Sequence, residues 1–172
     1  LAFIKEKHAG ESGIVYTSSR AKAETICAFL AAEGINCLCY HAGLSREQRE
    51  LSQTRFLHEK DAVIVATIAF GMGIDKADVR FVAHTSLPKS IENYVQEIGR
   101  AGRDGQKAEA WLCFSGGDAF FQKKRIAESD AEDWYKNISE VKQDVMQGYA
   151  ESTECRRNLL LAYFGEETKE AC

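Results

Sequence analysis

Short apolar runs alternate with amphipathic stretches along the first two thirds of the chain. The apolar runs carry few polar residues, which is typical of strands that are buried on both faces. Between them, apolar residues recur at helical spacing. The pattern predicts strands at residues 13–17, 37–40, 63–66, 81–84 and 110–114 and helices at residues 21–33, 45–58 and 90–99. This alternation implies an α/β fold in which helices sandwich a parallel β-sheet.

Two helix ends carry local signals of their own. Ser45 followed three residues later by Gln48 forms the sequence pattern of a capping box and starts the second helix. Gly34 follows the first helix and ends it. In open parallel sheets, functional groups gather in the loops after the strands. We therefore look for chemistry after residues 17, 40 and 66.

The pattern changes after Ser115. The remaining segment predicts three helices, at about residues 117–129, 136–150 and 152–163, and no strand. We therefore expect two domains, an α/β lobe over residues 1–115 and a small helical appendage over residues 116–172.

Charge is divided unevenly between these two parts. The chain has 22 Lys and Arg against 26 Asp and Glu, a net charge of −4. Residues 1–115 carry 14 of each sign, so the remaining 8 basic and 12 acidic residues place the whole excess after Ser115. The total argues against a broadly basic nucleic-acid binder. With neither a signal-peptide pattern nor a long apolar run, we expect a cytoplasmic (bacterial nucleoid) or nuclear protein that is not secreted.

The loop at residues 67–76 combines groups that suit an anion. Gly71 and Gly73 allow close backbone approach, with the Thr67 hydroxyl at one end and the Asp75 carboxylate at the other. The loop fits neither common phosphate motif, and the chain has no Walker A lysine. This chain by itself cannot be a complete P-loop ATPase.

A second group of candidates lies at residues 96–105. Arg100 and Arg103, three residues apart, each directly follow a glycine, and their planar forks could grip a phosphate group. The alternative is a basic loop whose arginines pair with Glu97 and Asp104.

At these two segments the chain resembles the RecQ family of superfamily 2 DNA helicases. Residues 66–76 resemble the family's motif V, residues 96–105 resemble motif VI, and residues 16–20 resemble motif IV. The blocks at residues 40–45 and 87–92 follow the family order as well. The resemblance implies a second RecA-like lobe followed by the truncated start of a zinc-binding subdomain.

The resemblance implies roles in ATP hydrolysis. ATP and Mg²⁺ would be bound mainly by a first lobe that this sequence lacks, so the fragment alone should be inactive. Arg103 would be the arginine finger, Arg100 a second γ-phosphate contact and Gln96 a nucleotide sensor. Asp75 would address the ribose or the lobe interface, and the remaining nucleotide-side candidates are Gly71 and Gly73.

The resemblance also implies contacts to a DNA backbone. The candidates are Ser19, Arg20, His41 and Thr67, which would use short donors and local charge. Each has a structural alternative: His41 as a structural histidine, Thr67 as a strand-end hydroxyl that bonds local backbone, and Arg20 as a solvated first-turn residue.

Two cysteines lie in the acidic tail. Cys155 precedes two arginines, and Cys172 follows at 172 − 155 = 17 residues, where the family's zinc cluster begins. They would form half of a four-cysteine Zn²⁺ site in the full-length protein. With two thiolates, this chain should hold zinc weakly or not at all.

The function implied is that of the second motor lobe of an ATP-dependent 3′–5′ DNA helicase in recombination and repair. Its partners would be single-stranded or duplex DNA and the first RecA-like lobe, in a motor that is monomeric and not membrane-bound. One alternative is an RNA helicase lobe of the DEAD-box kind, whose motif VI begins with His and holds a third arginine, where this chain has Gln96 and Gly105. The other is a non-catalytic nucleic-acid-binding or regulatory module.

Overall fold

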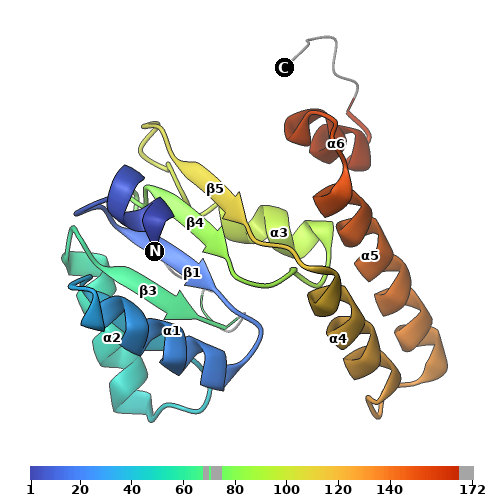
Figure 1. The fold of residues 1–172 in the computed structure, drawn as a ribbon, viewed down its shortest axis with the longest axis horizontal. Helices are drawn as coiled ribbons and strands as arrows, with labels where there is room; N and C mark the ends of the chain where they lie inside the picture. Colours follow the sequence, from blue (N-terminus) through green and yellow to red (C-terminus); the bar gives the residue numbers. More distant parts are fainter. Residues whose placement is uncertain (68–69, 71–74, 167–172) are drawn as a thin grey trace. The chain divides into compact units, whose positions relative to one another are not determined.

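The structure, a computed structural model, describes residues 1–67, 70 and 75–166. Five strands and a short π-helix lie among the helices (Figure 1). The strands are β1 (Gly13–Tyr16), β2 (Cys37–Tyr40), β3 (Val63–Ala66), β4 (Phe81–His84) and β5 (Glu109–Leu112). The helices are η1 (Phe3–Lys7), α1 (Arg20–Ala32), α2 (Arg46–His58), α3 (Ile91–Ile98), α4 (Gly116–Ala127), α5 (Asp133–Glu151) and α6 (Arg156–Tyr163).

All five strands join one parallel sheet in the order β2-β3-β1-β4-β5. The central strand β1 pairs on one side with β3 and on the other with β4, so that Tyr16 lies opposite both Ala66 and His84. The predicted α/β class is thereby confirmed. The parallel register also brings the residues after each strand to one edge of the sheet, where Figure 1 shows the arrowheads of β1 and β3 ending together.

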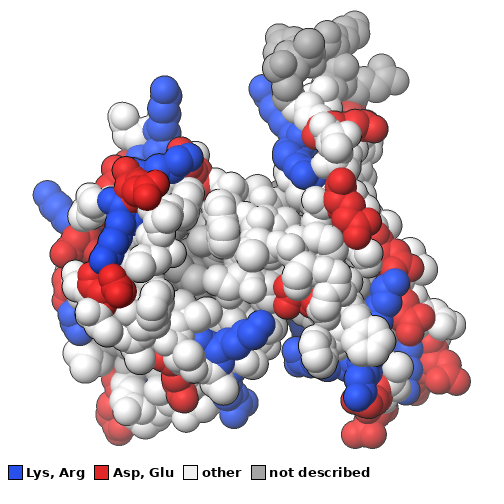
Figure 2. Space-filling model, in the orientation of Figure 1, with Lys and Arg blue, Asp and Glu red and all other residues white. Residues whose placement is uncertain are grey.

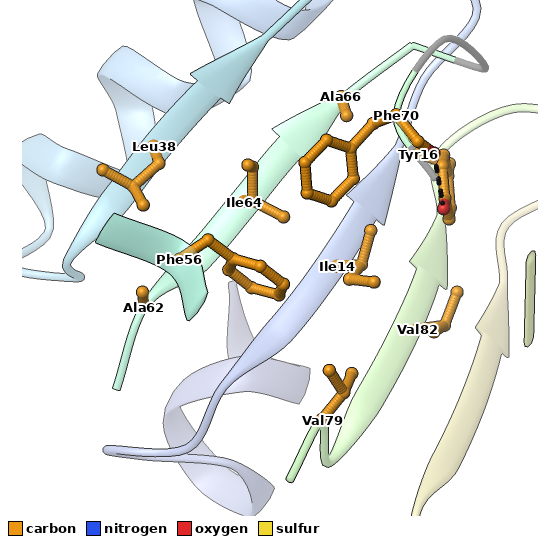
Figure 3. Packing of buried hydrophobic residues seen from close by; sticks show 10 residues of the cluster. All are labelled: Ile14, Tyr16, Leu38, Phe56, Ala62, Ile64, Ala66, Phe70, Val79 and Val82. Carbon is orange, nitrogen blue, oxygen red and sulfur yellow. Dashed lines mark hydrogen bonds between the residues drawn. The ribbon is translucent and has the colours of Figure 1, made fainter. Parts of the chain in front are cut away.

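Alternate residues of each strand enter two different apolar clusters, as a pleated strand requires. Ile14 and Tyr16 belong to the cluster that packs against Phe56 of α2, which Figure 3 shows beside Ile14 and Ile64. Val15 belongs to the other cluster, with Ala23 and Leu30 of α1. Helices therefore cover both faces of the sheet, and every residue of β1, β3 and β4 is buried.

The local helix signals act as the sequence predicts. The Ser45 side chain accepts from the Gln48 N–H at 3.2 Å and the Gln48 side chain accepts from the Ser45 N–H at 3.0 Å, which completes the capping box. Gly34 has φ = +80°, a conformation that suits glycine at a helix end. The apolar pattern missed helix η1, whose Phe3 stacks on Trp111 of edge strand β5 with ring centroids 5.9 Å apart.

The chain divides into two compact units. The first consists of Leu1–Ser86 and Val95–Cys113, and the second of Leu87–Tyr94 with the described residues after Cys113. Within the second unit, α5 buries Gln143, Met146 and Tyr149, and the Tyr149 ring lies 5.5 Å from that of Tyr94. The tail helices start and end within a few residues of the prediction, except that α6 begins at Arg156 instead of residue 152. Within the described part of the chain, no helix combines the length and apolar character needed to cross a bilayer.

Candidate functional site

The loops after β1, β2 and β3 meet at the carboxyl edge of the sheet. Backbone hydrogen bonds extend the ladder one residue past the strands: Thr17 N–H donates to Ala66 O at 2.9 Å and Thr67 N–H donates to Tyr40 O at 3.3 Å. Thr67 is therefore fixed at this edge by its backbone, with its side chain partly exposed. This places Thr67 at the same level as the residue after β2, which is His41.

Ser19 and Arg20 start helix α1 at this edge. The Ser19 hydroxyl accepts from the Lys22 N–H at 3.2 Å and caps the helix. Both residues are exposed. The Arg20 side chain passes Gly43, where an added Cβ would lie 3.2 Å from Arg20 Cδ. Gly43 thus leaves room for Arg20, and the loops after β1 and β2 lie side by side.

His41 is buried, with 2% of its surface exposed. Its Nδ1 accepts from the Gly43 N–H at 3.2 Å, so in the neutral ring the proton is on Nε2. Nε2 lies 3.1 Å from Glu24 Oε1, outside hydrogen-bond alignment, in a contact that becomes an ion pair when the ring is protonated. The imidazole holds the turn at Gly43, as the structural alternative for this residue describes.

The loop after β3 is anchored to the core by Phe70. Its ring is 2% exposed and packs edge-on against Tyr40 and Phe56, with centroids 4.8 and 5.6 Å away. The Tyr16 hydroxyl donates to Phe70 O at 3.1 Å, the dashed line of Figure 3. The candidates Gly71 and Gly73 lie outside the described residues.

Tyr16 also meets the segment that carries Arg100. Burial raises the pKa of the Tyr16 hydroxyl, and the positive charge and hydrogen bond of Arg100 oppose that rise. The ring of Tyr16 stacks on His84, with centroids 5.3 Å apart. His84 Nε2 in turn lies 2.7 Å from Glu97 Oε2, and both residues are buried. Tyr16 therefore contacts residues from both candidate loops.

Sequence reasoning missed this role of His84 and Glu97. A detectable signal exists, because His84 ends an apolar strand where the other strands end in Tyr, Ala or Leu. A polar residue at such a position needs a partner inside the protein. The identity of that partner depends on how the sheet is ordered, which the pattern does not supply.

Arg103 and Asp75, 28 residues apart, come together at the edge of the first unit. Arg103 Nη1 donates to Asp75 Oδ1 at 3.2 Å, and Arg103 Nε donates to Gly99 O at 3.3 Å. The Asp75 side chain is 89% exposed and that of Arg103 is 39% exposed. Gln96 is exposed on α3, one helical turn before Arg100.

The loop after Arg103 is tied to the segment that leads into β4. Gly102 N–H donates to Val79 O at 2.9 Å, and Arg80 Nη2 donates to Asp104 Oδ2 at 2.6 Å. That hydrogen bond from Arg80 is the main reason that the pKa of Asp104 is lowered. Gly102 has φ = +66°, which suits glycine alone in so tight a turn. The two carboxylates that the sequence offered to the arginines thus bond elsewhere, Glu97 with His84 and Asp104 with Arg80.

Only one of the two zinc candidates lies among the residues that the structure describes. Cys155, the residue before α6, is disulfide-bonded in the structure and so does not present a zinc-binding thiolate there. Cys172 lies outside the described residues. Within the described ranges, no cluster of three or more His, Cys, Asp or Glu side chains could hold a metal ion.

Comparison with known proteins assigns this arrangement to a class. Residues 1–105 match the model of the helicase conserved C-terminal domain, and residues 116–172 match the model described as RecQ zinc-binding. The chain belongs to the RecQ family of helicases. It is 47% identical over 163 residues to the ATP-dependent DNA helicase RecQ of Pasteurella multocida, covering 95% of this chain and 26% of that protein.

Two further matches are a second RecQ-like relative and a solved structure of a DEAD-box protein with a similar fold. The RecQ-like DNA helicase BLM of Xenopus laevis is 46% identical over 167 residues, covering 95% of this chain and 12% of that protein. The structure of the E. coli DEAD-box protein SrmB, solved with regulator of ribonuclease activity A, is similar with a TM-score of 0.59 at 28% identity. That match covers 74% of this chain and 75% of SrmB. The chain thus spans about a quarter or less of the length of the RecQ relatives.

Proposed function

We propose that this chain is the second motor lobe of an ATP-dependent 3′–5′ DNA helicase, with Arg103 as its arginine finger. The observation that carries the proposal is the pairing of Arg103 with Asp75 at 3.2 Å on an exposed edge. An exposed ion pair is worth about 1 kcal/mol or less, so the guanidinium can leave the carboxylate for a phosphate group. Asp75 then keeps Arg103 extended at this edge until nucleotide arrives.

Arg100 and Gln96 complete the nucleotide side of the lobe in this proposal. Arg100 lies against Tyr16 at the end of α3 and would make a second contact to the γ-phosphate. Gln96, exposed one turn earlier, would sense the nucleotide. Asp75 would address the ribose or the lobe interface, and Gly71 and Gly73 are the remaining nucleotide-side candidates. Donors held in place before the reaction stabilise charge that develops in the transition state.

The DNA side would be the carboxyl edge formed by the loops after β1, β2 and β3. Ser19, Arg20 and Thr67 are at the surface there, and we propose that they contact backbone phosphates. His41 would join this set by holding the turn at Gly43 beside Arg20. Phosphate contacts of this kind carry no sequence information and suit a motor that steps along DNA.

The rest of the motor would come from a longer protein. ATP and Mg²⁺ would be bound mainly by a first RecA-like lobe, which would also be the lobe's protein partner in a monomeric motor that acts in recombination and repair in the cytoplasm or nucleus. We propose residues 1–115 as the motor lobe and residues 116–172 as a linker and partial zinc-binding subdomain. Cys155 is disulfide-bonded in the structure, so zinc binding would first need its reduction to a thiolate. Reduced Cys155 and Cys172 would suit Zn²⁺, but they are two ligands short of a four-ligand structural site. Zinc binding by this chain alone should therefore be weak, and one tightly bound zinc per chain would contradict this.

The experiment is strand separation by the two-lobe protein, on DNA duplexes with a 3′ or a 5′ single-stranded tail and on the matching RNA duplex. The proposal expects ATP-dependent unwinding of the 3′-tailed DNA. Unwinding of RNA alone would favour the DEAD-box alternative, and absence of any ATP-dependent unwinding would favour a non-catalytic module. The isolated chain should hydrolyse ATP no faster than background, because it lacks a Walker A lysine.

A further inference from the structure

The second unit contains a cavity of about 380 Å³ that the motor function does not use. It lies where the segment before α3 meets helices α4 and α5, all within one unit. Its lining includes Lys89 before α3, Arg125 of α4, and Ser139, Lys142 and Gln143 of α5. Its size is within the range of small-ligand sites in proteins.

The charge of this lining is opposite to that of its surroundings. Residues 116–172 hold 8 basic and 12 acidic residues, and Figure 2 shows both signs over α4 and α5. Among the described residues that line the cavity, three are basic and none is acidic. The cavity lining is therefore basic, although two of the elements that form it, α4 and α5, belong to the acidic part of the chain.

Two of the three cations keep their charge available. Lys142 Nζ is 2.9 Å from Glu92 Oε1, so its charge is partly neutralised. Lys89 and Arg125 are both exposed, and neither forms an ion pair within the part of the chain that the structure describes. Arg125 in addition offers a planar fork of N–H donors.

Gln143 gives an independent reason to expect a ligand. It lines the cavity although only 1% of its surface is exposed, so it lies at the base. Its buried Nε2 has no hydrogen-bond partner among the described residues. A buried amide donor without a partner is costly, and because Gln143 lines the cavity, a group that fills the cavity can supply the missing acceptor.

We infer that this cavity binds a phosphate group, held by Arg125 and Lys89 at the rim and by Gln143 Nε2 at the base. The donors come from α4, α5 and the segment before α3, so a group with several acceptor oxygens, such as phosphate, can be met by all three. The phosphate could belong to a small ligand or to a nucleic-acid backbone. The inference does not depend on the roles proposed for Arg100 and Arg103.

The test is NMR titration of this chain with inorganic phosphate, read at the side-chain amide of Gln143. We expect a saturable shift, and about tenfold weaker binding in Arg125→Gln, the loss expected for one charge-assisted hydrogen bond. Lys123→Gln is the matched control, since Lys123 pairs with Asp144 at 2.6 Å and does not line the cavity. Gln143→Met keeps the volume and removes the donor, so phosphate binding should weaken while the chain stays folded.

A single-stranded oligonucleotide and succinate complete the test. Displacement of phosphate by the oligonucleotide would identify a nucleic-acid backbone as the source, whereas phosphate saturation without displacement would identify a small phosphate-bearing ligand. The inference is overturned if the shift does not saturate, if succinate binds as well as phosphate, or if Arg125→Gln and Gln143→Met bind phosphate as the unaltered chain does.

Discussion

His84 Nε2 and Glu97 Oε2 lie 2.7 Å apart inside the first unit, with both residues buried. The contact joins the last residue of β4 to α3, the helix that precedes Arg100 and Arg103. Because Tyr16 stacks on the same imidazole and bonds Phe70 O, one buried group of side chains touches both candidate loops. The position of the arginines therefore depends on residues that do not contact a ligand.

Glu97→Ala should lower the free energy of unfolding by about 2–3 kcal/mol, because it leaves a buried polar partner unsatisfied. Urea unfolding of the chain measures the loss. Glu50→Ala is the matched control: Glu50 pairs with Arg46 on the exposed face of α2, and its loss should cost about 0.5 kcal/mol or less. Equal effects of the two substitutions would show that the buried contact does not stabilise the lobe.

Tyr16→Phe removes the hydroxyl that bonds Phe70 O and keeps the ring that stacks on His84. We expect a stability loss of about 1 kcal/mol, the usual value of one hydrogen bond. In the two-lobe protein, DNA stimulation of ATPase activity should fall by a larger factor than the basal rate, because the hydroxyl links the two loops. A proportional fall in both rates would contradict the linking role.

Gly13→Ala and Gly148→Ala should change stability in opposite directions. A Cβ at Gly13 would lie 2.1 Å from the buried ring of Phe81, so we expect a loss of about 1–3 kcal/mol. A Cβ at Gly148 meets nothing within 4 Å inside α5, and the substitution should add about 0.5–1 kcal/mol. Circular dichroism during urea unfolding compares the two. A stable Gly13→Ala protein would show that β1 and Phe81 are less tightly packed than the structure indicates.

The second unit should lose stability in acid through Glu92. Hydrogen bonds from Ser90 and then from Lys142 lower the pKa of Glu92 to about 2, from an ordinary value of 4.5. A depressed pKa contributes stability above pH 4.5 that is lost as the pH falls from 4.5 towards 2. The difference in unfolding midpoint between the unaltered chain and Glu92→Gln should shrink over this range, and a difference that stays constant with pH would contradict it.

The sequence predicted the sheet well because its signals are local. The strands at residues 37–40, 63–66 and 81–84 match the structure at both ends, since each apolar run stops at a polar residue or a turn. The capping box at Ser45 depends on two residues three apart. Helix η1 has no such signal, because its one buried residue, Ile4, gives no periodicity.

The site was only partly predictable, for a reason of distance along the chain. The pattern identified Arg103 and Asp75 as candidates, yet their contact joins residues 28 apart. Glu97 pairs with His84, and Asp104 pairs with Arg80. Both partners lie on or just before β4, so the pairs depend on where β4 is placed in the sheet. Local patterns fix none of these neighbours. The sequence alone therefore could not decide whether Arg100 and Arg103 pair with Glu97 and Asp104.

The most direct test of the account is the DNA-stimulated ATPase turnover of the two-lobe protein carrying Arg103→Ala. In the role of arginine finger proposed above, Arg103 would stabilise charge on the transferred phosphoryl group, so its loss should lower turnover about 10³-fold or more. Arg46→Ala, an exposed substitution on α2, should leave turnover unchanged. Turnover that survives Arg103→Ala within a few fold of the unaltered protein would contradict the account.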